Sequence, residues 1–329
     1  MIDFKTPEFV DVGEVTLPVY KAGPNPADTD KPPLVLLHGW PDIAFSWRKQ
    51  MEALAAEGYP VFAPDQRGFG RASKPEGREN YTVAKLAGDL AGLLDHYSLE
   101  DAVFIGHDWG AIVLWQLPHY IGDRVRGYAG LAVPLMRHFP VDPISLFKAH
   151  LGDDMYIVRF QTEGACEPVL EADLRATFKF FHRKPGLGLD GEGDFSFSTK
   201  NLDLISLLQE GEAAWGGENL LSEDELQMYV DAYTESGFTA PLHWYRNMTA
   251  NWEAQKEFLV GGELPKLMKP CLMITAELDR ACPPSLSDGM EDLCEPYERI
   301  DMKDCGHWLP AERTEEVNAA LKSWLARHF

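Results

Sequence analysis

The feature that most restricts the fold is the pentapeptide Gly106-His107-Asp108-Trp109-Gly110. It follows a short apolar run, residues 103–105, and opens a stretch with helical patterning, residues 109–120. Its spacing is that of the G-x-S-x-G elbow, in which a tight turn between a strand and a helix lifts the central side chain above a sheet. The flanking glycines let such a turn close. The sequence therefore predicts a strand-turn-helix unit that presents Asp108.

The central residue of this pentapeptide is an aspartate where the general pattern has a serine. A serine that attacked a saturated carbon would form an ether, which water does not cleave. A carboxylate that attacks such a carbon forms an ester whose carbonyl is open to water, so that the enzyme is regenerated. Asp108 therefore predicts a substrate with a reactive saturated carbon, such as an epoxide or an alkyl halide.

Strand-like and helix-like patterns alternate on both sides of the pentapeptide. The expected strands are residues 34–37, 61–63, 103–105, 125–133, 271–275 and 296–300, and the expected helices are 45–57, 83–97, 109–120 and 314–329. This rhythm predicts an α/β fold with a mostly parallel central sheet flanked by helices. Aromatic-rich helical patterns interrupt it around a Gly- and Asp-rich stretch, 184–194. We therefore expect a core of residues 1–134 and 250–329 and an inserted helical cap (lid) of residues 135–249.

Charge and cysteine content argue against several classes of partner. The 52 acidic and 30 basic residues give a formal charge of -22, which disfavours nucleic acid and anionic membranes as partners. The five cysteines show no metal-ligand spacing, and we expect neither a metal nor a cofactor. The N-terminal sequence is acidic where a secretory signal would be basic and then apolar, and the chain has no apolar span of roughly 18 residues. A cytoplasmic location is therefore expected.

Hydrolysis of an ester on Asp108 requires a base that activates water. The candidate is His307, in the sequence DCGHW just ahead of the last helical stretch, because catalytic triads on such elbows run in the order nucleophile, acid, histidine. Asp279 follows an expected strand and is the candidate acid, with Glu277 and Asp292 as competitors. The loop after the preceding expected strand carries no carboxylate. Asp279 would hold the imidazole tautomer and stabilise the imidazolium.

The sequence HGWP at 38–41 follows another expected strand and predicts an oxyanion loop. During ester hydrolysis negative charge develops on the Asp108 carboxyl oxygen, and the backbone N–H groups of Trp40 and Trp109 would receive it. The position of Pro41 in a tight turn favours a cis bond before it. His38 is interpreted as a structural residue that bonds to backbone.

Three sequences, HGWPD at 38–42, DQRGFGRAS at 65–73 and GHDWG at 106–110, resemble those of the epoxide hydrolase branch of the α/β-hydrolase superfamily. The resemblance covers nearly the whole chain. It implies an α/β-hydrolase fold with an inserted helical cap domain, and an enzyme that converts an epoxide and water to a vicinal diol. HGxP and GHDWG also occur in haloalkane dehalogenases. The sequence of the cap is therefore needed to distinguish an epoxide oxygen from a halide as the leaving group.

Two segments of the expected cap, YIVRFQ at 156–161 and PLHWYRNM at 241–248, resemble those that hold the epoxide-activating tyrosines of that family. The resemblance places these acids at Tyr156 and Tyr245. Opening an epoxide leaves an alkoxide that must be protonated, and a phenol of pKa about 10 is acidic enough to do so. A departing halide needs no proton. A dehalogenase would instead use neutral N–H donors, for which Trp109 is a candidate and Trp40 and Trp244 are weaker ones.

The sequence thus predicts an epoxide hydrolase that takes a small apolar epoxide and acts as a monomer or homodimer. The alternative with the same nucleophile is a haloalkane or haloacid dehalogenase. The alternative from another class is a non-catalytic module that binds a small molecule or a protein, since a fold does not dictate a function. A serine esterase is disfavoured because no G-x-S-x-G occurs in the chain.

Overall fold

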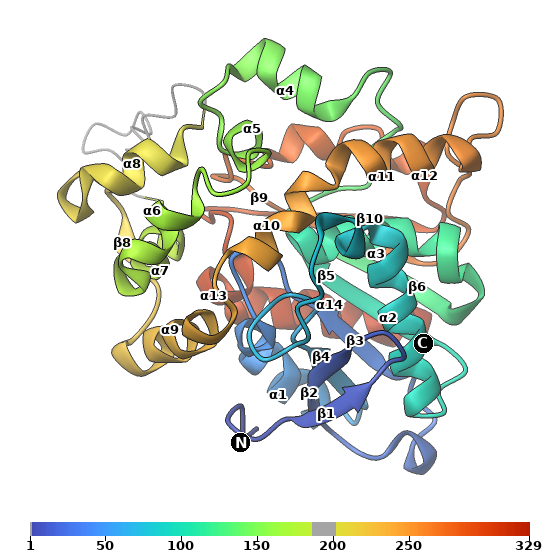
Figure 1. Ribbon diagram of the computed structural model, residues 1–329. Coiled ribbons are helices and arrows are strands. Elements are labelled where there is room, and N and C mark those ends of the chain that lie inside the picture. The colour runs from blue at the N-terminus through green and yellow to red at the C-terminus, as the bar shows by residue number, and fades with distance from the viewer. Residues whose placement is uncertain (1, 186–201) are drawn as a thin grey trace.

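An eight-stranded sheet forms the centre of the computed structural model, which describes residues 2–185 and 202–329 (Figure 1). Its strand order is β1-β2-β4-β3-β5-β6-β9-β10. β2 pairs antiparallel with β1 and β4, and all other neighbours in the sheet are parallel. The strands are β1 Glu8–Asp11, β2 Thr16–Ala22, β3 Leu34–Leu37, β4 Val61–Pro64, β5 Ala102–His107, β6 Val125–Leu131, β9 Cys271–Ala276 and β10 Tyr297–Met302. The predicted mostly parallel sheet is therefore confirmed.

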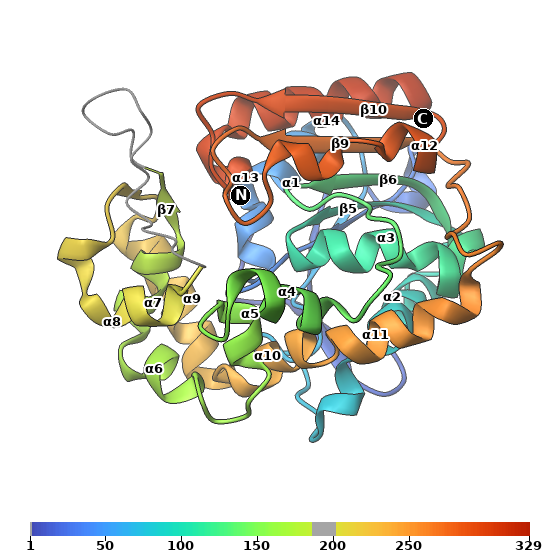
Figure 2. The ribbon, with the colours of Figure 1, turned by 90° about the horizontal axis from the view of Figure 1, so that it is seen from above.

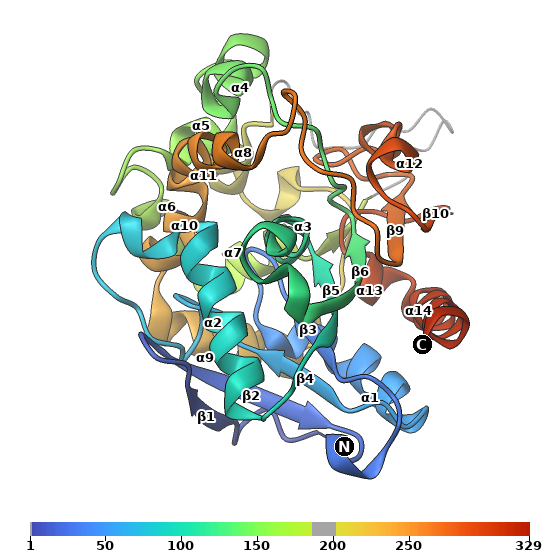
Figure 3. The same ribbon diagram turned by 90° about the vertical axis from the view of Figure 1, so that its right-hand side faces the viewer.

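Helices cover both faces of this sheet, with α1 and α14 on one face and α2 and α3 on the other (Figure 3). They span α1 Arg48–Ala56, α2 Val83–His96, α3 Trp109–Ile121, α12 Met290–Leu293, α13 Leu309–Glu312 and α14 Thr314–His328. In β3, Leu34 and Leu36 pack in the cluster that contains α1 and α14, whereas Val35 and Leu37 pack in the cluster that contains α2 and α3. A strand buried on both faces reads as a continuous apolar run, which is why β3 is recognisable from its sequence.

The chain between β6 and β9 forms a group of helices that lies outside the sheet (Figure 2). These elements are α4 Pro143–Leu151, α5 Tyr156–Phe160, α6 Glu167–Ala172, α7 Leu174–Phe181, β7 Arg183–Lys184, α8 Leu204–Glu210, β8 Glu218–Asn219, α9 Glu223–Ser236, α10 Thr239–Arg246 and α11 Met248–Gln255. The expected boundary between cap and core at 249/250 falls inside α11. The Gly- and Asp-rich stretch expected within 184–194 lies outside the described residues from position 186 onward.

Short 3-10 helices complete the connections. They are η1 Pro26–Asp28, η2 Ala44–Trp47, η3 Arg78–Tyr81, η4 Gly122–Arg124, η5 Glu212–Ala214, η6 Lys256–Phe258 and η7 Pro284–Ser287. Part of the helix expected over 45–57 is thus a 3-10 turn, η2, that leads into α1. Within the two described ranges, no helix combines the length and the apolar character that crossing a lipid bilayer demands.

Candidate active site

Asp108 lies in a sharp turn between β5 and α3. Its φ of 53° is in the left-handed region, which residues other than glycine seldom adopt. A Cβ on Gly106 would lie 2.4 Å from the carbonyl oxygen of Gly110, and a Cβ on Gly110 would lie 2.0 Å from that of Leu37. The turn therefore requires glycine on both sides of the tripeptide His107-Asp108-Trp109, and it places the aspartate directly after β5.

The loop after β3 lies against the Asp108 side chain. A Cβ on Gly39 would be 2.4 Å from Asp108 Cβ, so close packing requires glycine here as well. The backbone N–H of Trp40 donates a hydrogen bond to Asp108 Oδ1 at 2.7 Å. The bond between Trp40 and Pro41 is cis, which confirms that expectation. Trp109 is the first residue of α3. That its backbone N–H group helps to form the oxyanion hole stays a prediction.

His38 is fully buried beneath this loop and bonds to backbone on both sides. Its Nδ1 lies 2.9 Å from the Gly39 carbonyl oxygen, and its Nε2 accepts a hydrogen bond from the Gln66 N–H at 3.0 Å. These partners select the neutral tautomer with the proton on Nδ1. Burial also lowers the pKa of His38 to about 4. These contacts support the interpretation of His38 as a structural residue.

His307 lies between two carboxylates. Its Nδ1 is 2.7 Å from Asp279 Oδ2, and its Nε2 is 3.6 Å from Asp108 Oδ2. The second oxygen of Asp279, Oδ1, accepts a hydrogen bond from the Cys282 N–H at 2.9 Å. On the other side, His107 Nε2 bonds to the His307 carbonyl oxygen at 2.8 Å. The structure therefore brings Asp108, Asp279 and His307 together, with the imidazole in the middle.

Electrostatic interactions within this triad shift the pKa values of His307 and Asp108. Burial disfavours the imidazolium, but the carboxylates of Asp279 and Asp108 outweigh burial and raise the pKa of His307 well above its ordinary value. Burial also works against ionised Asp108, yet the hydrogen bond and charge of His307 outweigh it and lower the pKa of this carboxyl. Asp108 is thus held in the carboxylate form, which is the form that can act as a nucleophile.

The two competitors for the acid position lie elsewhere. Glu277 pairs with Lys303 at 3.0 Å, and Asp292 pairs with Arg137 at 3.1 Å. All four side chains of these pairs are exposed, whereas the Asp279 side chain is 1% exposed. Of the three acids weighed from the sequence, Asp279 is the one that contacts His307.

Tyr156 begins α5 and Tyr245 belongs to α10, and their ring centroids are 6.0 Å apart. Both line the same cavity as Asp108 and His307. Burial raises the pKa of each phenol well above its ordinary value, so both keep their protons at neutral pH. The Trp109 ring packs edge-on against the Tyr245 ring, with centroids 4.9 Å apart. The indole that a dehalogenase would aim at a halide therefore lies against a phenol.

The cavity above Asp108 has a volume of about 130 Å³. An apolar cavity of about 150 Å³ accommodates benzene, so this space suits a small apolar molecule. Its apolar wall residues come from both the sheet loops and the helices between β6 and β9: Trp40, Pro41, Phe181, Leu202, Leu204, Leu278, Cys282 and Trp308.

Sequence reasoning missed several of these wall residues. Leu202, Leu278 and Cys282 belong to no motif, and only the folded chain brings them to one cavity. His107 was identifiable as part of the elbow, but its bond to the His307 carbonyl oxygen joins residues 200 positions apart. The sequence carries no local signal for a contact of that kind.

Residues 32–314 match the alpha/beta hydrolase fold family. The chain is 39% identical to epoxide hydrolase A of Mycobacterium tuberculosis (strain ATCC 25618 / H37Rv), over 97% of each chain. It is 37% identical to bifunctional epoxide hydrolase 2 of Sus scrofa, over 89% of this chain and 51% of the relative. The crystal structure of epoxide hydrolase A from Mycobacterium thermoresistibile superposes with a TM-score of 0.83 at 33% identity and covers 98% of both chains. The chain therefore belongs to the epoxide hydrolases of the alpha/beta hydrolase fold family.

Proposed function

We propose that this enzyme converts a small apolar epoxide and water to a vicinal diol through a covalent ester on Asp108. The observation that carries the proposal is that one cavity is lined by an ionised elbow aspartate, the His307 imidazole and two buried phenols. A carboxylate supplies the nucleophile that a saturated carbon requires, and the phenols supply the proton that an opening ring requires. The names of the relatives support the same reaction.

In the first step, a carboxylate oxygen of Asp108 attacks a ring carbon and displaces the ring oxygen, which keeps the electron pair of the broken C–O bond. Tyr156 and Tyr245 hydrogen-bond to this oxygen, and one of them donates its proton. Because burial keeps both phenols protonated, the proton is available when the ring opens. The product is a hydroxyalkyl ester of Asp108 and one tyrosinate.

In the second step, His307 removes a proton from water and the resulting hydroxide attacks the ester carbonyl carbon. Asp279 stabilises the imidazolium through the 2.7 Å bond to Nδ1. The N–H groups of Trp40 and Trp109 stabilise the tetrahedral oxyanion. The departing alcohol oxygen takes the proton from His307, and the carboxylic acid left on Asp108 gives up its proton while the tyrosinate regains one. The diol then leaves an unchanged enzyme.

We also propose that residues 135–249 act as the cap of a core formed by 1–134 and 250–329. This division gives the two domains separate tasks, because Tyr156 and Tyr245 belong to the cap whereas Asp108, Asp279 and His307 belong to the core. The Trp308 indole, which donates a hydrogen bond to the Phe181 carbonyl oxygen, is one of the contacts that would join them. The reaction then needs both domains in place.

The experiment compares the wild type and Asp108→Ala on styrene oxide and on a bromoalkane, with diol and bromide measured separately. We expect diol from the wild type and none above background from the variant. Bromide release without diol would establish dehalogenation instead. Neither product from either substrate class, over a panel of small epoxides, would favour a binding module.

A further inference from the structure

The helix that carries Tyr245 is held by a core loop that contains no proposed catalytic group. This loop, residues 65–70, follows β4 and approaches α10 closely. A Cβ on Gly68 would lie 3.3 Å from the backbone carbon and from the side chain of Ala240, which belongs to α10. Gly68 has a φ of +93°, which favours glycine, and a Cβ there would also lie 2.8 Å from the Tyr81 ring.

One hydrogen bond joins the loop to the residue beside the proposed acid. The indole Nε1–H of Trp244 donates to the Arg67 carbonyl oxygen at 3.1 Å. Trp244 is completely buried, and its ring packs edge-on against Phe69 at 5.1 Å and against Trp109 at 5.8 Å between centroids. Because Trp244 directly precedes Tyr245 on α10, this bond restricts the rotation and height of the turn from which the phenol projects.

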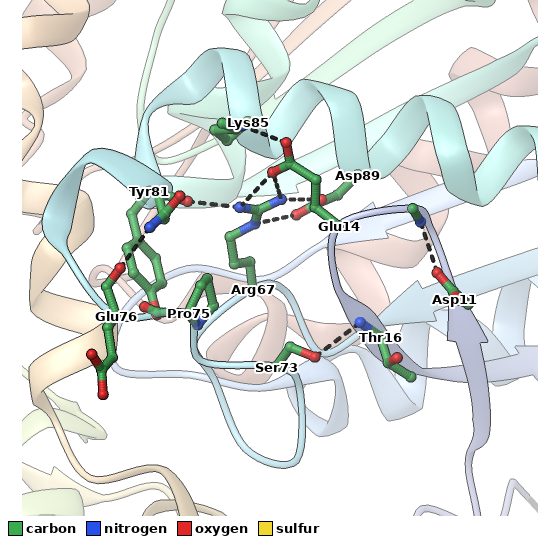
Figure 4. A network of polar contacts seen from close by, with 12 residues as sticks. Asp11, Glu14, Thr16, Arg67, Ser73, Pro75, Glu76, Tyr81, Lys85 and Asp89 are labelled. Atoms are coloured by element: carbon green, nitrogen blue, oxygen red, sulfur yellow. Dashed lines mark hydrogen bonds and ion pairs between the residues drawn. The ribbon is translucent and has the colours of Figure 1, made fainter.

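The Arg67 side chain anchors the carbonyl that receives this bond (Figure 4). Its guanidinium makes a two-pronged ion pair with Asp89 of α2, at 2.8 Å from Nε and 2.6 Å from Nη2. Nη1 donates to the Asn80 carbonyl oxygen at 2.8 Å, and Glu14 lies beside Nη2 at 3.4 Å. The Arg67 side chain is 1% exposed, so solvent does not weaken the pair. A two-pronged pair fixes the orientation of the guanidinium plane.

A second set of contacts, made by the neighbours of Trp244 and Tyr245 in the chain, holds the same C-terminal end of α10. The side chain of Asn247, which follows α10, donates a hydrogen bond to the Arg78 carbonyl oxygen in η3. The His243 ring lies 5.2 Å from the Tyr81 ring, also in η3. Trp244 is therefore one of several residues that hold this end of α10, so that loss of its bond should shift the helix locally without releasing it.

We propose that Trp244, Arg67 and Asp89 form a positioning chain that sets where the Tyr245 hydroxyl meets the epoxide oxygen. The inference rests on the proposed function, because it assumes that Tyr245 is a proton donor. None of the three residues lines the cavity by its own side chain or touches substrate, and they act only through Tyr245. Their loss should slow ring opening, where the phenol is used, and leave ester hydrolysis unchanged, because His307 carries out that step.

The test is Trp244→Phe, which removes the N–H donor and keeps an aromatic ring. Rapid acid quenching and intact-mass measurement of the protein ester separate its formation from its decay. We expect ester formation to slow by about tenfold or more, since a displacement of about 1 Å in a reacting group costs up to a hundredfold. The matched control is Trp252→Phe on α11, which loses an equivalent indole bond, to the Phe139 carbonyl oxygen at 2.8 Å, and should change neither rate.

A double-mutant cycle with Tyr245→Phe decides whether the effect passes through the phenol. Trp244→Phe should add no further loss in the Tyr245→Phe background. An equal loss in both backgrounds, or equal slowing of ester formation and decay, would overturn the positioning chain. Arg67→Lys keeps the buried charge but loses the two-pronged ion pair with Asp89. It is the second variant if Trp244→Phe does not fold, and it should likewise slow ester formation and leave ester decay unchanged. If Tyr245→Phe alone does not slow ester formation, the result contradicts the proposed role of Tyr245 as a proton donor and not the structural link between Trp244 and Arg67.

Discussion

Asp108 and His307 shift each other's pKa values. In the proposed reaction, formation of the ester on Asp108 removes this mutual effect. In the resting enzyme the Asp108 carboxylate helps to raise the pKa of His307, and His307 helps to lower that of Asp108. Formation of the ester removes the negative charge from Asp108. The pKa of His307 then falls, because one of its two stabilising carboxylates is neutral. His307 can then give its proton to the tyrosinate that ring opening leaves, and the neutral imidazole is the base at the step that requires one. The proton that Asp108 releases at the end of the cycle restores the imidazolium.

His307→Gln should therefore form the ester and fail to hydrolyse it. The loss of the base predicts a fall in steady-state diol formation of at least about a hundredfold. The protein should also gain the mass of one substrate molecule per chain within the first turnover, as measured by intact-mass spectrometry. His150→Gln, at an exposed histidine of α4, serves as the control and should show neither effect. A variant that lost diol formation without accumulating the adduct would exclude His307 as the base for hydrolysis.

At the scale of the element, the elbow is a packing arrangement as much as a sequence motif. Gly110 lies where α3 meets the end of β3, and Gly106 lies where β5 meets the first turn of α3. The glycines allow the backbone of the helix to contact the backbone of the strands directly. The motif was recognisable because this requirement is local. The bond from Trp244 to Arg67 was not, because it joins residues 177 positions apart.

Gly110→Ala should damage the fold, because its Cβ would lie 2.0 Å from the Leu37 carbonyl oxygen. We expect a loss of about 3 kcal/mol or more in the free energy of unfolding, or no folded protein, since backbone cannot yield as a side chain does. Gly88→Ala is the matched control. Gly88 lies within α2 and has open space around its Cβ position, so alanine there should stabilise the protein by about 0.5 to 1 kcal/mol. Chemical denaturation of both variants tests the contrast, and equal effects would contradict it.

For the whole molecule, the sequence predicted the parallel part of the sheet but not its antiparallel edge. β3, β5 and β9 are buried along their whole length, and their sequences are apolar apart from His107 and Thr275. β1 is the edge strand and buries one residue of its four, so its sequence lacks that signal. In β2 the polar residues Thr16 and Lys21 and the proline Pro18 interrupt the apolar run. Wall residues outside the motifs, such as Leu202 and Cys282, also escaped prediction, since they come from segments far apart in the chain. Patterns of short range predict elements and motifs, whereas contacts between distant elements require the fold.

The stability of the whole molecule should depend on pH through a buried acid next to β4. Asp65 is 3% exposed and accepts a hydrogen bond from the Ala44 N–H at 2.9 Å. Burial raises its pKa from 3.8 to about 7. Between these values the folded chain binds a proton that the unfolded chain has lost, so the free energy of unfolding falls as pH rises from about 4 to about 7. The full effect is on the order of 4 kcal/mol, at 1.36 kcal/mol per pKa unit.

Asp65→Asn keeps an oxygen acceptor for Ala44 and removes this titration. We expect the slope of unfolding free energy against pH, measured by urea denaturation between pH 5 and 7, to be shallower in the variant. The repulsion within a chain of formal charge -22 adds a decline of the same sign, but that part depends on salt and persists in the variant. Repeating the series at high salt therefore separates the two causes. If both proteins showed the same slope at high salt, Asp65 would not titrate in this range, and its carboxylate would have to be ionised in the folded protein despite its burial.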